Sequence, residues 1–157
     1  MHRARSALLL VALILFASVP AVAQMGDMKM PMDKPASTAL TRQAYTTNRA
    51  FLVKIVSIPN PIPYEKYFKL GLEVYDGGDP SKKISDAQVK VAAGMRHGMS
   101  SGFMHGMQST PKVDVQNGVV TVSGMYFHMQ GPWTLATTVT SGGKEGVAYL
   151  QLPCCAQ

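Results

Sequence analysis

The chain has 157 residues, of which 46% are hydrophobic and 15% are charged, and its formal net charge at pH 7 is +6. This length suits one domain and is short for two. The lysines are spread along the chain instead of forming a basic cluster, so we exclude a nucleic-acid-binding protein. The chain has two cysteines, and they are adjacent, so no disulfide within the chain can join distant parts of the fold.

Residues 1–23 predict a cleavable signal peptide. Arg3 and Arg5 make its start basic, residues 7–19 form an apolar stretch, and Ala21-Val22-Ala23 is a small-residue cleavage site. The apolar stretch is shorter than the roughly 20 residues that a membrane-spanning helix needs. We therefore expect a periplasmic protein that keeps no stable membrane span after cleavage, with an uncleaved membrane anchor as the alternative.

Residues 24–44 are expected to form a flexible lead-in, because they are rich in Met, Pro, Ser, Thr and charged residues and show no helical or strand period. Four methionines are spaced two or three residues apart in this segment. Thioether sulfur is a soft ligand, and it binds Cu(I) without first losing a proton. These methionines are secondary candidate copper ligands, with incidental methionines of a mobile tail as the alternative: Met25, Met28, Met30 and Met32.

Residues 45–153 predict one all-β domain. Apolar and polar residues alternate with a period of two in most of its segments, which is typical of strands with one buried face. Turn sequences such as Asp76-Gly77-Gly78-Asp79-Pro80 and Asn117-Gly118 separate these segments. The expected strands are residues 51–56, 68–75, 88–93, 111–116, 119–126, 133–139 and 147–152. About seven short strands, with no segment long and periodic enough for a helix, predict an antiparallel immunoglobulin-like β-sandwich in which Trp133 anchors the core.

The connection after the third expected strand is rich in methionine and histidine. It contains His-Gly-Met twice, as His97-Gly98-Met99 and as His105-Gly106-Met107, and it also carries Met95 and Met104. Imidazole suits copper and zinc, and thioether sulfur is a soft donor, so the mixture indicates copper, with Cu(I) favoured over Cu(II). The alternative is that the methionines form an adaptable apolar contact surface.

A second candidate segment is the corner between residues 124 and 132. If the chain stays extended there, Met125 and Met129 share one face and His128 lies on the other. A bend or bulge before Gly131-Pro132 would let His128 and Met129 bind the same metal ion. The primary candidate ligands from both segments are Met95, His97, Met99, Met104, His105, Met107, Met125, His128 and Met129.

Residues 154–157 are expected to form a tail that carries Cys154 and Cys155. In an oxidising compartment these cysteines could form a vicinal disulfide, pair between chains, or supply thiolates to a soft metal. A reactive tail without a dedicated role is equally open. Both cysteines are therefore secondary candidate metal ligands.

The motifs resemble those of the YtkA-like or FixH-like family of small exported or membrane-anchored β-sandwich domains. The resemblance covers residues 45–152, and its motifs are Met95-Arg96-His97-Gly98-Met99, Pro111-Lys112-Val113, Gly118 to Gly124, and Phe127 to Leu135. It implies that the Met/His loop lies near the 127–135 corner. FixH-like members are associated with copper transport and with assembly of a haem–copper oxidase, and they typically keep a membrane anchor. The cleavable signal, the second His-Gly-Met copy, the methionine run and the cysteine pair depart from that pattern and favour soluble copper binding.

We expect no enzyme, because the sequence has no nucleophile elbow, phosphate loop or His-Glu-x-x-His motif. The expected function is periplasmic copper binding for sequestration or delivery, in copper homeostasis or resistance or in cuproprotein assembly. The expected partners are the copper ion and a copper-receiving or copper-exporting envelope protein. The alternatives are an interaction module of the cell envelope that binds no metal, and a FixH-like accessory factor for oxidase assembly.

Overall fold

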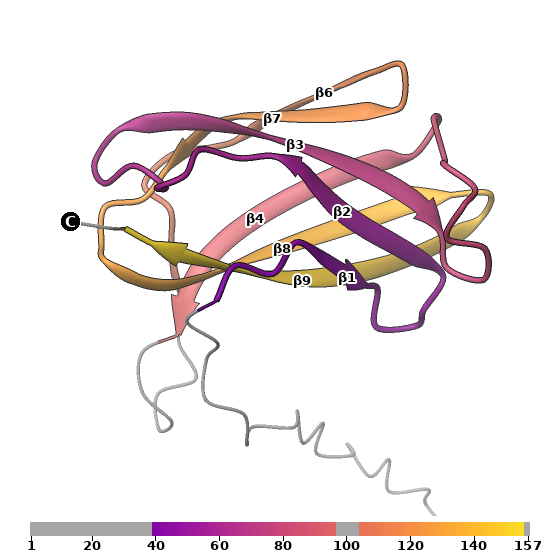
Figure 1. Cartoon of the computed structure of the whole chain (residues 1–157), viewed down its shortest axis with the longest axis horizontal. Coiled ribbons are helices and arrows are strands. Elements are labelled where there is room, and N and C mark those ends of the chain that lie inside the picture. The colour runs from indigo at the N-terminus through magenta and orange to yellow at the C-terminus, as the bar shows by residue number, and fades with distance from the viewer. Residues whose placement is uncertain (1–38, 97–103, 156–157) are drawn as a thin grey trace, which may run out of the picture. The chain divides into compact units, whose positions relative to one another are not determined.

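The computed structural model describes residues 39–96 and 104–155, and within these ranges it contains nine β-strands in two sheets (Figure 1). All strand pairs are antiparallel, so the predicted all-β antiparallel sandwich is confirmed. The expected signal peptide lies outside the described residues, as do the candidate ligands Met25, Met28, Met30, Met32, His97 and Met99.

The order of the strands is that of an immunoglobulin-like sandwich. One sheet contains, in spatial order, β1 (Gln43–Tyr45), β2 (Phe51–Ser57), β3 (Tyr67–Asp76), β7 (Val119–Tyr126) and β6 (Lys112–Gln116). The other contains β5 (Met104–Gly106), β4 (Gln88–Arg96), β8 (Gly131–Ser141) and β9 (Lys144–Cys154). Apart from the additional edge strand β1, the first sheet follows the A-B-E-D order and the second follows C′-C-F-G.

The strands with clear alternation and tight turns form where the sequence predicts them. Strand β7 has the expected bounds, and the hairpin before it turns at Asn117 and Gly118. These two residues have φ values of 51° and 71°, the positive values that a type I′ turn requires. A second hairpin joins β8 to β9 and pairs Ser141 with Lys144.

Three boundaries need correction. The sequence predicts a flexible segment up to residue 44, but Gln43–Tyr45 pairs with β2, and the Thr41 N–H donates to the Gln151 carbonyl. The predicted Met/His connection contains the short strand β5. The predicted tail from residue 154 is also wrong at its start, because β9 continues to Cys154. Pro153 is compatible with this strand since β9 is the edge of its sheet, where a missing N–H is tolerated.

Trp133 lies at the centre of the core, as predicted. It is completely buried, and its ring stacks on Phe127 with the centroids 4.2 Å apart and the planes inclined by 6°. Phe127 in turn makes an edge-on contact with Phe68 of β3, which belongs to the sheet that faces Trp133, with a centroid distance of 5.1 Å. The Trp133 Nε1–H donates to the Met129 carbonyl oxygen at 2.9 Å. Trp133 therefore joins the two sheets and holds the β7–β8 corner.

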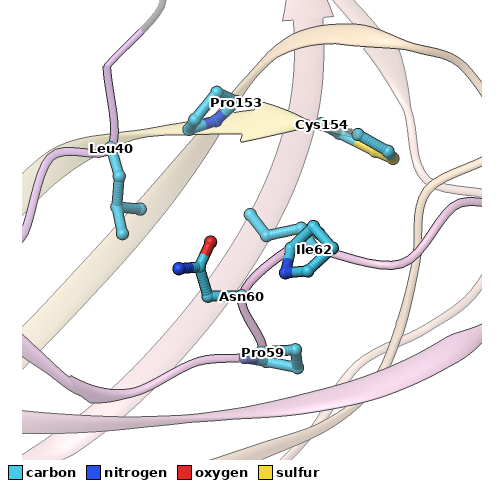
Figure 2. A pocket seen from close by; sticks show the side chains of 8 residues that line it. Leu40, Pro59, Asn60, Ile62, Pro153 and Cys154 are labelled. Carbon is cyan, nitrogen blue, oxygen red and sulfur yellow. A yellow bond between two sulfur atoms is a disulfide. The ribbon is translucent and has the colours of Figure 1, made fainter. Parts of the chain in front are cut away.

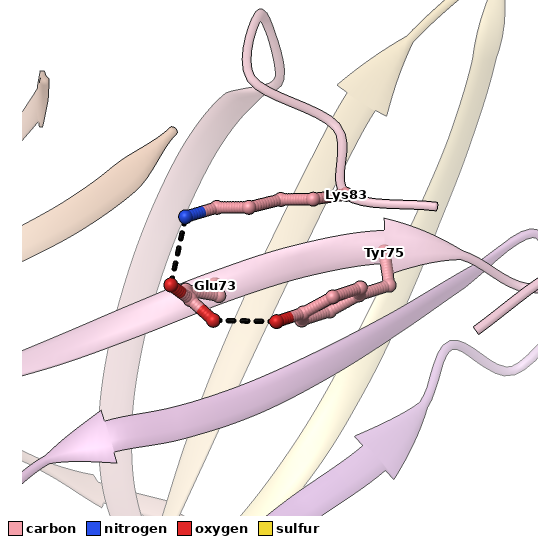
Figure 3. A network of polar contacts seen from close by, with 3 residues as sticks. All are labelled: Glu73, Tyr75 and Lys83. Atoms are coloured by element: carbon pink, nitrogen blue, oxygen red, sulfur yellow. Dashed lines mark hydrogen bonds and ion pairs between the residues drawn. The ribbon is translucent and has the colours of Figure 1, made fainter. Parts of the chain in front are cut away.

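A polar network covers part of the outer face of the first sheet (Figure 3). Glu73 accepts hydrogen bonds from Lys83 Nζ at 2.7 Å and from the Tyr75 hydroxyl at 2.6 Å. Lys54 Nζ lies 4.0 Å from the centre of the Tyr75 ring. The hydrogen bonds from Lys83 and then from Tyr75 hold the pKa of Glu73 below its usual value.

Replacing Glu73 by glutamine is expected to lower the free energy of unfolding by less than about 1 kcal/mol at pH 7, since the network is near the surface. The folded-state pKa of Glu73 is depressed, so its contribution is present above the unfolded value of about 4.3 and is lost as the pH falls through the folded value. Urea unfolding of Glu73→Gln and wild type at pH 7 and at low pH measures this difference. Glu145→Gln is the control, and a difference that grows at low pH would contradict the prediction.

Candidate metal centre

One end of the sandwich gathers the chain segments that carry the candidate ligands, at the left of Figure 1 beside the label C. Strand β4 ends there at Arg96, which pairs with Met104 at the start of β5. Strand β8 begins there, and Gly131 pairs with Cys154 at the end of β9. Strand β7 ends there as well, and its last residue, Tyr126, pairs with the first residue of β3. The end of β4, the start of β5 and the β7–β8 corner therefore lie at the same end of the sandwich.

A row of four paired residues crosses the second sheet near this end. His105 on β5 pairs with Met95 on β4, Met95 pairs with Trp133 on β8, and Trp133 pairs with Leu152 on β9. Directly opposed residues project on the same face of a sheet, with Cβ atoms about 4.5–5.5 Å apart. Trp133 and Leu152 are completely buried, Met95 is 5% exposed, and His105 is exposed at the edge. An accessible imidazole thus lies beside a buried thioether.

Met95 also reaches the β7–β8 corner. A Cβ atom built on Gly131 would lie 2.6 Å from the Met95 Cε atom, so the methionine methyl occupies the place of a side chain at position 131. Gly131 has φ +130°, a conformation that side-chain-bearing residues rarely adopt. The corner residues His128 and Met129 are two or three positions away in the chain. The thioether at the end of β4 therefore contacts the second candidate segment.

His128 offers a nitrogen without a hydrogen-bond partner. Strand β7 ends before it, at Tyr126, and the chain bends at Met129. The His128 ring meets Trp133 edge-on, with the centroids 5.6 Å apart and the planes at 73°. Its Nδ1 is buried and has no hydrogen-bond partner among the described residues. An unpaired buried polar atom costs about 1–3 kcal/mol, which a bound metal ion would offset.

The other candidate methionines differ in their surroundings. Met107 is half-buried against the core, and its N–H donates to the Ala93 carbonyl at 3.2 Å. Met129 is also half-buried, and its carbonyl accepts the Trp133 hydrogen bond. Met125 is completely buried opposite Phe68, so it packs as a core residue. Met104 belongs to β5, and its side chain lies outside the described part of the structure.

The two cysteines are part of the folded domain. Cys154 is the last residue of β9 and is 6% exposed, and Cys155 is half-buried. Their sulfurs are joined as a vicinal disulfide across a cis peptide bond. Of the arrangements that the sequence allows, the structure therefore contains the vicinal pair. Sequence reasoning missed the burial of Cys154, although the apolar alternation through residues 148, 150 and 152 continues to it.

The donor set at this end consists of thioethers and imidazoles. Within residues 39–96 and 104–155, no group of three or more His, Cys, Asp or Glu side chains is placed to hold a metal ion. Soft thioether donors select Cu(I), and imidazole also suits copper, so the residues present fit copper better than a hard cation.

Residues 39–96 and 104–155 contain no helix that is long and apolar enough to cross a membrane.

Comparisons of this chain with protein-family models, with curated proteins and with solved structures found no match. Membership of the YtkA-like or FixH-like family therefore stays a prediction from the motifs.

Proposed function

We propose that this protein is a periplasmic copper-binding protein that holds Cu(I) through imidazole and thioether ligands for sequestration or delivery. The observation that supports this proposal most is the convergence at one end of the sandwich. His105 pairs with Met95, Met95 contacts Gly131, and the same corner carries His128 with its unpaired buried nitrogen. Residues of β4, β5 and the β7–β8 corner thus bring thioether and imidazole groups to one end of the sandwich.

The exposure of the ligands favours exchange over permanent storage. His105 is exposed, and Met107, His128 and Met129 are half-buried. A partner can replace such ligands one at a time, whereas a fully enclosed ion would need the domain to open. The partner that fits is a copper-receiving or copper-exporting envelope protein. His97, Met99 and Met104 are further ligands proposed from the sequence alone.

The proposal predicts that the purified protein competes with a chromophoric Cu(I) chelator under anaerobic conditions. We expect His105→Ala combined with His128→Ala to weaken Cu(I) binding at least tenfold, because both imidazoles are removed and only thioethers remain. His97→Ala combined with His105→Ala tests the sequence-derived loop ligands in the same assay. The control is Gln116→Ala, a substitution on an exposed residue at the end of β6. A chelator that keeps all the copper at equimolar wild-type protein would refute copper binding.

A second candidate function is an interaction module of the cell envelope that binds no metal. Exposed tyrosines near the same end favour it, since Tyr67 is 72% exposed and Tyr64 is 40% exposed. Tyr67 contacts Tyr126 with a ring-centroid distance of 5.1 Å, so the aromatic surface extends onto β7. Metal analysis of protein purified from copper-supplemented cells separates the two candidates, because the module would carry no stoichiometric copper. A FixH-like role in oxidase assembly would require copper and a specific receiving protein.

A further inference from the structure

Strand β9 holds Cys154 at the end of the core. Ala148, Leu150 and Leu152 are completely buried at alternate positions of this strand, and Cys154 continues the series at 6% exposure. Side chains at alternate strand positions project to the same face, so the Cys154 side chain projects inward. Its position is fixed by the pairing of Cys154 with Gly131. The sulfur of Cys154 is therefore held by a strand and not by a free tail.

The Met95 thioether approaches the same place from the other side of β8. The Met95 methyl lies 2.6 Å from where a Cβ atom of Gly131 would be. Cys154 is directly opposite Gly131, and opposed residues have Cβ positions roughly 5 Å apart. Because Gly131 has no side chain, the Met95 methyl fills the space beside it, on the residue that pairs with Cys154. Two sulfur-bearing side chains from the two neighbours of β8 thus converge on one glycine.

A cavity of about 310 Å³ lies beside the cysteine pair (Figure 2). Its remaining walls come from the β2–β3 connection, from the segment before β1 and from the end of β9: Pro59, Asn60, Pro61, Ile62, Leu40 and Pro153. None of these six residues is ionisable. Apolar surroundings disfavour a bare thiolate, so two thiols here would stay protonated until a soft metal ion binds the sulfurs and the protons are released to solvent. The cavity gives such an ion a route to the pair.

We propose that the reduced pair of Cys154 and Cys155 is a thiolate site for Cu(I), joined by the Met95 thioether, and that the vicinal disulfide closes this site. The inference rests on the proposed copper-binding function and adds a second, redox-dependent set of ligands to it. Reduction of the disulfide takes two electrons and two protons from a dithiol, which becomes a disulfide itself. Binding of one Cu(I) then releases the two thiol protons and forms two copper–sulfur bonds. Thiolates select Cu(I), so the reduced protein binds it more tightly than the oxidised protein.

The test compares Cu(I) affinity in the two redox states. One sample is reduced with a dithiol, freed of it by anaerobic gel filtration and checked for two thiols per chain, and the other stays oxidised. Each is titrated with Cu(I) against a chromophoric chelator. We expect binding at least tenfold tighter in the reduced sample, with ultraviolet thiolate-to-copper charge-transfer absorption that the oxidised sample lacks.

Two variants separate the sulfur ligands from general effects on the fold. Cys154→Ala combined with Cys155→Ser should abolish the gain on reduction and keep the affinity of the oxidised wild type. Met95→Leu, which conserves side-chain volume, should weaken binding in both states if the thioether also serves the Met/His ligands, and its charge-transfer absorption should shift in the reduced state. Urea unfolding of each variant shows that it is folded under the assay conditions.

The outcomes distinguish this inference from the copper function itself. Equal Cu(I) affinity in both redox states overturns the thiolate site and leaves copper binding through Met and His in place. Binding in the reduced state alone supports the thiolate site and overturns the Met/His proposal. No binding in either state overturns both. A gain on reduction that persists in the double cysteine variant also overturns the inference.

Discussion

Replacing Trp133 by alanine is expected to lower the free energy of unfolding by about 3–5 kcal/mol. Trp133 is completely buried, so the change removes a large side chain and leaves a cavity in the core. It also removes the stacking on Phe127 and the hydrogen bond to the Met129 carbonyl. Domains of this size have total stabilities of about 5–15 kcal/mol, so Trp133→Ala is close to abolishing folding. Trp133 is the single tryptophan, so urea unfolding is followed by circular dichroism for all variants.

Trp133→Phe separates packing from positioning. It keeps an aromatic ring against Phe127 and removes the Nε1–H donor, so we expect a smaller loss of stability than for alanine. The lost hydrogen bond frees the Met129 carbonyl, and the corner that carries His128 becomes less well held. Cu(I) affinity should therefore fall in Trp133→Phe by more than the fraction of unfolded protein accounts for. Unchanged copper affinity in this variant would show that the hydrogen bond does not position the corner.

The strands that could be predicted are those whose pattern is local. Strand β7 alternates over eight residues after an Asn-Gly turn, so both its period and its start are visible in the sequence. Strands β1 and β5 have three residues each, too few to show a period. They form because their backbone groups pair with the longer neighbours β2 and β4. Their stability comes from tertiary pairing and not from local preference.

The end of β9 shows how one residue can hide a strand. The predicted strand stops at residue 152, just before Pro153, which lacks an N–H and normally interrupts a ladder. The structure pairs Pro153 with Pro132 at the sheet edge and continues to Cys154. Alternation of buried residues was the better guide here than the proline. Because this alternation continues past Pro153, the strand carries Cys154 into the core.

The chemistry of the candidate site could be read from residue types, but its geometry could not. Histidine and methionine at short spacing indicate a soft metal wherever they lie. The row of His105, Met95 and Trp133 depends on the register between three strands, and a shift of one residue would move Met95 to the outer face. The contact of Met95 with Gly131 depends on the same register. The sequence therefore names the donors, and the sheet pairing determines which of them meet.

Gly131→Ala is expected to be strongly destabilising as well. Its φ of +130° is a conformation almost confined to glycine, and forcing a side chain into it costs about 1–3 kcal/mol. The new Cβ atom would lie 2.6 Å from the Met95 methyl, so the thioether must move and the core around it must repack. Gly142→Ala is the matched control, because Gly142 also has a positive φ, +56°, but a Cβ atom there meets nothing within 4 Å. Urea unfolding of both variants should therefore show a larger loss for Gly131→Ala.

A double-mutant cycle with Met95→Ala separates the two causes of this loss. If the clash with Met95 contributes, Gly131→Ala costs less in the Met95→Ala background than in wild type, and the difference is the coupling between the residues. Only backbone strain remains in the double variant, so Gly131→Ala costs less there than in wild type but still more than Gly142→Ala, because φ +56° lies in the left-handed region that L residues can adopt and φ +130° does not. Cu(I) affinity should fall in Gly131→Ala, since the displaced thioether no longer lies at the corner, and stay unchanged in Gly142→Ala. If the stability losses are additive and Gly131→Ala keeps the copper affinity of wild type, Met95 only fills space beside Gly131 and is not a ligand. The ligands would then have to come from His105, Met107, His128 and Met129.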